Sequence, residues 1–277
     1  MRQAITILFL LGFTAFAGTT VKNPNEKPQK ILYKEVKGFK LHLHVFAPAK
    51  KSEKPAPAII FYFGGGWNGG SPSQFYPHAK HLASKGIVAF CAEYRVKKVH
   101  KATPFECVED AKSAMRFLRK NAKKFGIDPN KIIAGGGSAG GHLAAATATV
   151  KSFDAKTDDK TISAVPNALV LFNPVYDNGP KGYGHDRVKA KYKEFSPMHN
   201  ITSKMPPAIV FLGTKDRLIP VSTGEKFRDL MKEAGVKSEL HVYKGQPHGF
   251  FNFRNKKYYD LTVKEMDRFL KELGFLK

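Results

Sequence analysis

The sequence predicts a single α/β domain with a mostly parallel central sheet and helices on both faces. Short apolar runs alternate with segments of helical periodicity, which is typical of strands joined by helical crossovers. Most of these runs are apolar throughout, as expected for strands that are covered on both faces. A chain of 277 residues is long enough for one such domain with a substantial core.

The first half of the chain predicts a hairpin, two strands and a helix. Residues 31–47 alternate in places between polar and apolar side chains and predict a leading antiparallel hairpin. A linker rich in Lys and Pro at 50–57 leads into a buried strand at 58–63. Residues 74–85 predict a helix, and residues 86–90 predict the next strand.

The best-marked helix is predicted at residues 103–125. Thr103 can cap its N-terminus, Pro104 suits the first helical position, and Glu106 completes a capping box. Gly126 ends the helix. Its apolar face, at helical spacing, consists of Val108, Ala111, Met115, Leu118 and Ala122.

The second half of the chain contains a further strand that leads to a serine. A turn at 128–130 precedes this strand, which ends at Ser138, and an alanine-rich helical segment follows at 144–150. Between residues 177 and 205 the pattern is least regular, with a short helical patch at 187–195. The remaining buried strands are predicted at 168–172, 207–213 and 238–243.

Ser138 lies in the pattern Gly-x-Ser-x-Gly at residues 136–140, which is typical of a nucleophile elbow. A strand that turns sharply into a helix holds the serine in a strained conformation, and glycines two positions away avoid collisions. The serine then lies at the carboxyl edge of the sheet, where helix amides can face an anion. These features predict Ser138 as the nucleophile of a hydrolase.

The same residues allow two other interpretations. Gly135, Gly137 and Gly140 also fit the dinucleotide-binding pattern Gly-x-Gly-x-x-Gly. That pattern requires an acidic residue at the next strand end, whereas Asp158 and Asp159 fall in a polar, lysine-rich loop. The other alternative is a glycine-rich turn without chemistry, which the presence of catalytic partners would exclude.

A nucleophilic serine needs a histidine that accepts its proton and a carboxylate that orients the histidine. Asp216 follows the strand at 207–213, and His248 follows the strand at 238–243. Both lie beyond carboxyl ends of strands, the edge where α/β sheets place their sites. Taken alone, Asp216 is more simply a turn carboxylate, and His248 is more simply a structural histidine, one of ten in the chain. Together with Ser138, in this order along the chain, they predict a catalytic triad.

A glycine-rich loop at residues 64–70 directly follows the strand at 58–63. Backbone amides of such a loop, with the amide after the nucleophile at Ala139, can stabilise the oxyanion of a tetrahedral intermediate. A phosphate-binding loop is not supported, because no Gly-Lys-Ser or Gly-Lys-Thr sequence follows.

These motifs resemble the α/β-hydrolase fold and, within it, the esterases similar to hormone-sensitive lipase. The family's His-Gly-Gly-Gly loop is matched here except that Phe63 replaces the histidine. The resemblance covers nearly all of the chain after about Lys30 and looks closest to small secreted carbohydrate acetyl and feruloyl esterases. It rests on residues 63–67, 93–95, 136–142, 215–216 and 248–250.

The resemblance implies one catalytic domain over residues 31–277 and an acyl-transfer mechanism that needs no cofactor and no metal. The His and Cys residues show no metal-ligand spacing in the sequence either. The residues that the resemblance assigns are Ser138 as nucleophile, Asp216 as orienting acid, His248 as base, and Gly65, Gly66 and Ala139 as oxyanion donors.

The segment between residues 177 and 205 is short, so we expect an open cleft that suits a bulky substrate with a small acyl group. Trp67, Tyr183 and Phe250 are candidate platforms for a sugar or an aromatic group. Packing in the core is the stronger alternative for each of them.

Residues 1–17 are typical of a secretory signal peptide, with Arg2 before an apolar run and a small-x-small site before Gly18. Residues 18–30 are polar and predict a flexible leader. No segment reaches the roughly 18 apolar residues that a membrane span requires. The sequence predicts a secreted or periplasmic protein, with an uncleaved, membrane-tethered signal as the alternative.

Cys91 and Cys107 are the two cysteines of the chain. An exported protein permits a disulfide between them, and two buried free thiols are the alternative. The sequence does not show whether their Cα atoms are close enough to be bridged.

The formal net charge of +23 favours anionic partners. The lysines are spread along the chain without a basic run interleaved with aromatic residues, which argues against nucleic acid. An acidic polysaccharide is the better candidate, and a solvated basic surface without a specific partner is the alternative.

The sequence therefore predicts a serine esterase that removes acetyl or feruloyl groups from plant or algal polysaccharides. The nearest alternative is a general carboxylesterase acting on small or lipid esters. A peptidase of the prolyl-oligopeptidase type and a non-catalytic protein on the same fold are the others. No segment provides the β-propeller that such peptidases usually carry, and non-catalytic relatives normally lose a triad residue.

Overall fold

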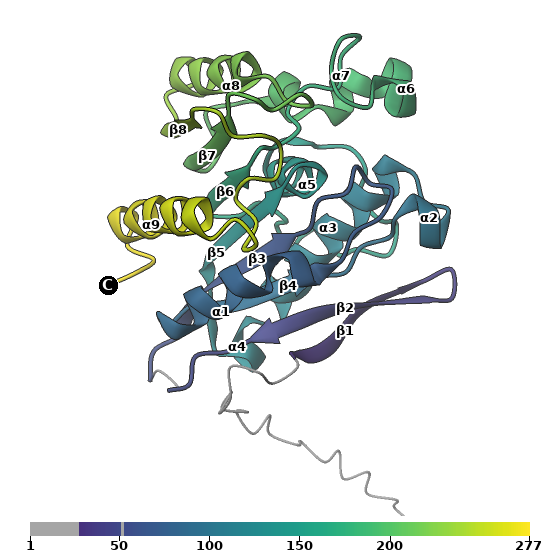
Figure 1. The fold of residues 1–277 in the computed structure, drawn as a ribbon. Helices are drawn as coiled ribbons and strands as arrows, with labels where there is room; N and C mark the ends of the chain where they lie inside the picture. The colour runs from purple at the N-terminus through teal and green to yellow at the C-terminus, as the bar shows by residue number, and fades with distance from the viewer. Residues whose placement is uncertain (1–27, 51–52) are drawn as a thin grey trace, which may run out of the picture.

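The computed structural model describes residues 28–50 and 53–277 and contains one eight-stranded sheet. The strands are β1 Gln29–Val36, β2 Phe39–Phe46, β3 Ala56–Tyr62, β4 Val88–Ala92, β5 Ile127–Gly137, β6 Ala168–Phe172, β7 Ala208–Gly213 and β8 Ser238–Tyr243. Their order across the sheet is β1-β2-β4-β3-β5-β6-β7-β8 (Figure 1). β2 pairs antiparallel with β1 and β4, and all other neighbours pair in parallel.

Nine α-helices and three 3-10 turns connect the strands in the described part of the chain. The longer helices are α1 Tyr76–Ser84, α3 Pro104–Lys120, α5 Ala139–Thr149, α8 Val221–Glu233 and α9 Lys256–Glu272. The short ones are α2 Lys97–His100, α4 Ala122–Phe125, α6 His185–Val188 and α7 Tyr192–Phe195. The 3-10 turns are Pro72–Phe75, Lys189–Lys191 and Pro197–Asn200.

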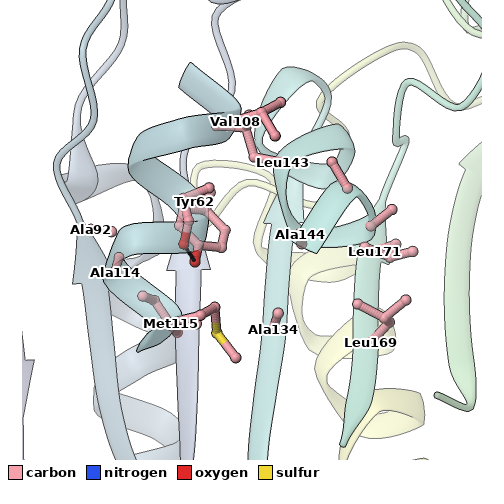
Figure 2. Packing of buried hydrophobic residues seen from close by; sticks show 14 of the residues in the cluster. Tyr62, Ala92, Val108, Ala114, Met115, Ala134, Leu143, Ala144, Leu169 and Leu171 are labelled. Atoms are coloured by element: carbon pink, nitrogen blue, oxygen red, sulfur yellow. Dashed lines mark hydrogen bonds between the residues drawn. The ribbon is translucent and has the colours of Figure 1, made fainter. Parts of the chain in front are cut away.

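Helices cover both faces of the sheet, with α1 and α9 on one face and α3, α5 and α8 on the other (Figure 1). Successive residues of β3 point to opposite faces, so Phe61 packs with α1 while Tyr62 packs with α3. Figure 2 shows the α3 face, where Tyr62, Met115 and Leu143 are fully buried. Burying a large apolar side chain contributes roughly 1.5–3 kcal/mol, so the two cores hold the sheet as a rigid base.

The predicted fold class and most of the predicted elements are confirmed. The hairpin forms β1 and β2, and the strands at 168–172 and 238–243 match β6 and β8 residue for residue. The predicted capping box is present, because the Thr103 hydroxyl accepts the Glu106 amide and the Glu106 carboxylate accepts the Thr103 amide.

Several predicted bounds shift: β3 begins at Ala56 inside the predicted linker, β4 covers 88–92 instead of 86–90, and α5 begins at Ala139 instead of residue 144. Two other predicted elements differ in their form. The long helix at 103–125 is interrupted at Asn121, whose side-chain amide donates to the Phe117 carbonyl and so competes with the helical backbone. The turn at 128–130 is a bulge inside β5, since Ile127 pairs with Ala56 and Ile132 with Ala58.

The two cysteines are both free and buried on opposite faces of the sheet. Cys91 lies in the core beneath α1, and Cys107 lies on α3, where its thiol donates to the Arg95 carbonyl at 3.1 Å. The sheet between them rules out the disulfide that the sequence left open.

The predicted signal peptide at 1–17 and most of the predicted leader at 18–30 lie outside the described residues. β1 begins at Gln29, so the last two residues of the leader belong to the sheet. Among residues 28–50 and 53–277, no helix combines the length and the apolar character that crossing a membrane requires.

Candidate active site

Ser138 lies at the junction of β5 and α5, with a backbone φ of 55° and ψ of −119°. This strained conformation is the one that the elbow pattern predicts. A Cβ atom on Gly136 would collide with the Gly140 carbonyl, and one on Gly140 would collide with the Tyr62 carbonyl. Glycine at both flanking positions is therefore a steric requirement of the turn.

The three predicted triad residues meet at the carboxyl edge of the sheet. The Ser138 Oγ lies 2.9 Å from the Nε2 of His248, and the Nδ1 of His248 lies 2.7 Å from Oδ2 of Asp216. Both distances are those of hydrogen bonds. The His248 side chain keeps 24% of its surface exposed, whereas the Asp216 side chain is fully buried. Solvent and substrate can therefore reach His248 but not Asp216.

Asp216 is built to stay ionised and to hold one orientation. Its Oδ1 accepts the backbone amides of Leu218 and Ile219 at 2.8 and 2.9 Å, which leaves Oδ2 for His248. Burial raises the pKa of this carboxyl, but the hydrogen bonds from His248 and the two amides outweigh it, so the pKa lies below its ordinary value. An ionised Asp216 fixes the tautomer in which His248 presents an acceptor nitrogen to the serine.

The glycine-rich loop after β3 lies directly against the elbow. A Cβ on Gly64 would be in van der Waals contact with the Cβ of Ser138, at 3.4 Å. Gly65 and Gly66 adopt φ values of 124° and 60°, which favour glycine. The structure thus places the start of this loop, at Gly64, against the serine. The role of Gly65, Gly66 and Ala139 as oxyanion donors stays a prediction.

Phe63, which stands where the resembled family has histidine, anchors the start of this loop. Its ring stacks on Tyr94 with centroids 4.1 Å apart, and the Tyr94 hydroxyl donates to the Phe63 carbonyl at 2.7 Å. Both side chains are buried, so the loop has a fixed base without a histidine.

The three predicted aromatic platforms have different environments. Trp67 and Phe250 keep only 1% and 2% of their surfaces exposed, so in this structure they are packing residues and present no ring face to a ligand. Tyr183 is half-buried, and its hydroxyl lies so close to Gly66 that a Cβ there would be 2.6 Å from it. Of the three, Tyr183 alone keeps exposed surface next to the glycine-rich loop, and its contact with substrate stays a prediction.

A series of side-chain amides, which the sequence did not reveal, joins the glycine-rich loop at 64–70 to the loop that carries His248. The Gly64 amide donates to Oε1 of Gln74 at 2.6 Å, and Nε2 of Gln74 donates to Oδ1 of Asn252 at 3.0 Å. Nδ2 of Asn252 then donates to the Gly249 carbonyl, next to His248, at 2.7 Å. We call Gln74 and Asn252 the amide bridge.

Asn173 is a third residue that sequence reasoning missed. It is fully buried, its Oδ1 accepts the Gly249 amide at 2.9 Å, and its Nδ2 lies 3.4 Å from Nε2 of His248. Its position directly after β6, at the same sheet edge as the triad, was the available signal. Gln74 and Asn252 lie in a 3-10 turn and a loop, and their sequence neighbourhoods carry no comparable signal.

No group of three or more His, Cys, Asp or Glu side chains is arranged to hold a metal ion in the described residues.

Comparisons with known proteins identify the family. A family model described as BD-FAE matches residues 43–176, and one described as the alpha/beta hydrolase fold matches residues 182–252. The acetylxylan esterase of Xylanibacter ruminicola is 28% identical over 251 residues, which cover 84% of this chain and 48% of that protein. Esterase LipC of Mycobacterium tuberculosis is 31% identical over 220 residues, which cover 71% and 54%. The chain spans about half the length of the curated relatives it matches.

Solved structures match over nearly their full length. Esterase 2 of Thermogutta terrifontis, phosphonylated by cyclosarin, superposes with a TM-score of 0.86 at 43% identity, covering 90% of this chain and 95% of that chain. The propionate-bound form of the same esterase superposes with a TM-score of 0.86 at 42% identity, covering 90% and 96%. With this coverage and the elbow geometry at Ser138, the chain belongs to the α/β-hydrolase family of serine esterases.

Proposed function

We propose that this protein hydrolyses carboxylic esters, acetyl or feruloyl, on plant or algal polysaccharides. The observation that carries the ester hydrolysis is the hydrogen-bonded series from Ser138 through His248 to the buried carboxylate of Asp216. This arrangement activates a serine for attack on an acyl carbon.

The reaction is acyl transfer in two halves. Nε2 of His248 takes the hydroxyl proton as Ser138 Oγ attacks the ester carbonyl, and the amides of the glycine loop and Ala139 bind the resulting oxyanion. The C–O bond to the alcohol breaks, and the alcohol leaves with the proton from His248. Water, deprotonated by the same nitrogen, then attacks the acyl-enzyme, and the carboxylic acid leaves as Ser138 recovers its proton.

Similarity to an acetylxylan esterase, the short segment near the glycine-rich loop and the positive net charge support a carbohydrate substrate. The chain is similar to an acetylxylan esterase over 84% of its length. The segment 177–204, which reaches the glycine loop through Tyr183, is short and contains only small helical turns. A segment this short fits the open cleft that a polymeric substrate requires. A predicted signal peptide at 1–17 and the net charge of +23 fit an exported enzyme acting on an acidic polysaccharide.

A general carboxylesterase is the second candidate. Thermogutta terrifontis esterase 2, at 42% and 41% identity, has structures with propionate and with butyrate bound, which are short-chain carboxylates. A site of the same architecture here would accept simple short-chain esters of many alcohols.

Initial rates on p-nitrophenyl acetate, methyl ferulate and acetylated xylan, with Ser138→Ala as the blank, test the proposal. We expect turnover of acetylated xylan or methyl ferulate that disappears in the variant. Turnover of p-nitrophenyl acetate alone would favour the general carboxylesterase. If no ester is cleaved, or if Ser138→Ala retains full activity, the proposed function is wrong, and peptide substrates come next.

A further inference from the structure

The segment around α6 contacts the glycine-rich loop at 64–70 through Tyr183 and Arg187. The Arg187 guanidinium donates from Nη1 to the Gly66 carbonyl at 2.5 Å, and the Tyr183 hydroxyl lies against the same glycine. Gly66 is one of the predicted oxyanion donors. The amide nitrogen and the carbonyl oxygen of one residue lie within about 4 Å of each other, so an oxyanion bound by the Gly66 amide would lie within roughly 10 Å of the guanidinium.

Aromatic rings hold this guanidinium in place. Its Cζ lies 6.0 Å from the ring centroid of Trp67 and 5.5 Å from that of Tyr183. Such cation–π contacts, with the bond to Gly66, restrict a side chain that is otherwise exposed. A restricted arginine loses less entropy when it binds a ligand.

Arg187 has no acidic partner in the part of the chain that the structure describes. Four other arginines, Arg95, Arg116, Arg228 and Arg268, are paired with carboxylates at 2.6–3.2 Å or closer. Arg119, in contrast, bonds to backbone carbonyls. Within residues 28–50 and 53–277, no carboxylate forms an ion pair with Arg187, although Asp186 precedes it directly. Most of its five N–H donors are therefore available to a ligand that reaches the glycine-rich loop.

The surroundings add positive charge. α2 is tied to the same loop, because the amides of Lys97 and Lys98 donate to the carbonyls of Trp67 and Asn68. Lys189 and Lys191 follow Arg187 in the chain, and Lys191 lies 5.5 Å from the Phe105 ring. Of the acids in this segment, Asp177 bonds to the Gly179 amide, while Asp186 and Glu194 are exposed.

We propose that Arg187 binds a carboxylate carried by the ester substrate itself, which makes the enzyme selective for esters of anionic molecules. This inference rests on the proposed function and narrows its substrate to acidic esters. A planar guanidinium with free donors matches a carboxylate with two parallel hydrogen bonds, and neither water nor a neutral hydroxyl offers an equal partner. The carboxylate belongs to the alcohol, as a uronate sugar, or to the acyl group.

Matched substrate pairs test the proposal and separate these two sources. The first pair is a methyl O-acetyl-glucuronoside and its uronamide, which differ only in the charge on the alcohol. The second pair is p-nitrophenyl hydrogen glutarate and its terminal amide, which differ only in the charge on the acyl group. The readout is the ratio of kcat/KM for the anionic and the neutral member.

We expect a ratio of about ten or more in one pair for the wild-type enzyme, because a charge-assisted pair is roughly twice as strong as a neutral hydrogen bond. Arg187→Gln should bring that ratio close to one. Lys193→Gln, which removes an exposed charge from α7 in the same segment, should leave it within about twofold. Added salt should lower the wild-type ratio and leave that of Arg187→Gln unchanged.

Two results would overturn the proposal. One is a wild-type ratio near one in both pairs. The other is an Arg187→Gln variant that slows both members of a pair equally, which would make Arg187 a support for Gly66 alone. Calorimetric binding of methyl glucuronoside and its uronamide to Ser138→Ala, with and without Arg187→Gln, decides the anion site even if the proposed hydrolysis fails.

Discussion

The amide bridge offers the sharpest test of how this site is held together. Gln74→Ala removes the acceptor of the Gly64 amide and the donor to Asn252 at once. Gly64 packs directly against Ser138, so a shift of its loop moves the neighbouring amides of Gly65 and Gly66 away from the oxyanion. We therefore expect a loss that is specific to the transition state, with kcat reduced and KM nearly unchanged.

The magnitude follows from the contacts that are lost. Complete loss of an oxyanion donor costs roughly 3–4 kcal/mol. A displaced donor keeps part of this stabilisation of the transition state. We therefore expect the activation free energy to rise by about 1.5–2.5 kcal/mol, which is roughly a 10- to 70-fold fall in kcat. Unfolding free energy should fall by about 1–3 kcal/mol, because a part-buried amide loses its partner.

A double-mutant cycle with Asn252→Ala shows whether the two side chains act together. Because Asn252 reaches the His248 loop through Gly249, each single variant should disturb both loops. The double variant should then lose less activity than the two singles combined, with a coupling energy of about 0.5–3 kcal/mol. The assay is initial-rate hydrolysis of p-nitrophenyl acetate, with chemical denaturation of the same samples.

Asn121→Ala is the matched control for stability. Its side-chain amide also bonds to a backbone carbonyl, but at the end of α3, away from the catalytic edge. It should lower stability and leave kcat within about twofold. If Gln74→Ala behaves like this control, losing stability but not kcat, the bridge only supports the fold and our reasoning is refuted.

Three further predictions follow from the described contacts. Asp216→Asn should lower kcat on p-nitrophenyl acetate by roughly 10³–10⁴-fold without unfolding the protein, because an amide facing His248 favours the wrong tautomer. Gly140→Ala should lower the unfolding free energy by at least about 2–3 kcal/mol in urea titrations, since the new methyl meets the Tyr62 carbonyl. Burial lowers the pKa of His78 to about 3 from an ordinary 6.5, so the unfolded chain alone binds this proton as pH falls from 6.5 toward 3. Stability should therefore decrease over that window, and His78→Leu should remove about 2 kcal/mol of the decrease between pH 7 and pH 5, measured by chemical denaturation.

Each of these expectations has a contrary outcome. Full activity of Asp216→Asn would mean that the carboxylate does not orient His248. An unchanged urea midpoint for Gly140→Ala would show that the backbone at the elbow can move aside. An acid slope in His78→Leu equal to that of the wild type would place the titrating groups elsewhere.

The sequence by itself determined the fold class and the three residues, Ser138, Asp216 and His248, whose side chains meet at one edge of the sheet. Gly136 and Gly140 identify the elbow because a sharp strand-to-helix turn leaves no room for a side chain, and this requirement is local. Asp216 and His248 could be found because parallel strands bring their carboxyl ends to one edge whatever the details of packing. The capping box at Thr103 is likewise decided within four residues.

Only the tertiary structure decided what surrounds the triad. Gln74 and Asn252 are 178 residues apart, and the side-chain bond between them arises because a turn before α1 and a loop before α9 lie on the same sheet face. Trp67 and Phe250 are residue types that can stack on a sugar. Their burial, which excludes this role here, depends on how distant segments pack around them. Arg187 lies in no recognisable sequence motif. Its candidate role as an anion-binding residue depends on the Gly66 carbonyl and the Trp67 and Tyr183 rings, which lie beside it only in the folded chain. Contacts of this kind depend on the packing of whole elements, which is a property of the folded chain and not of any short stretch of sequence.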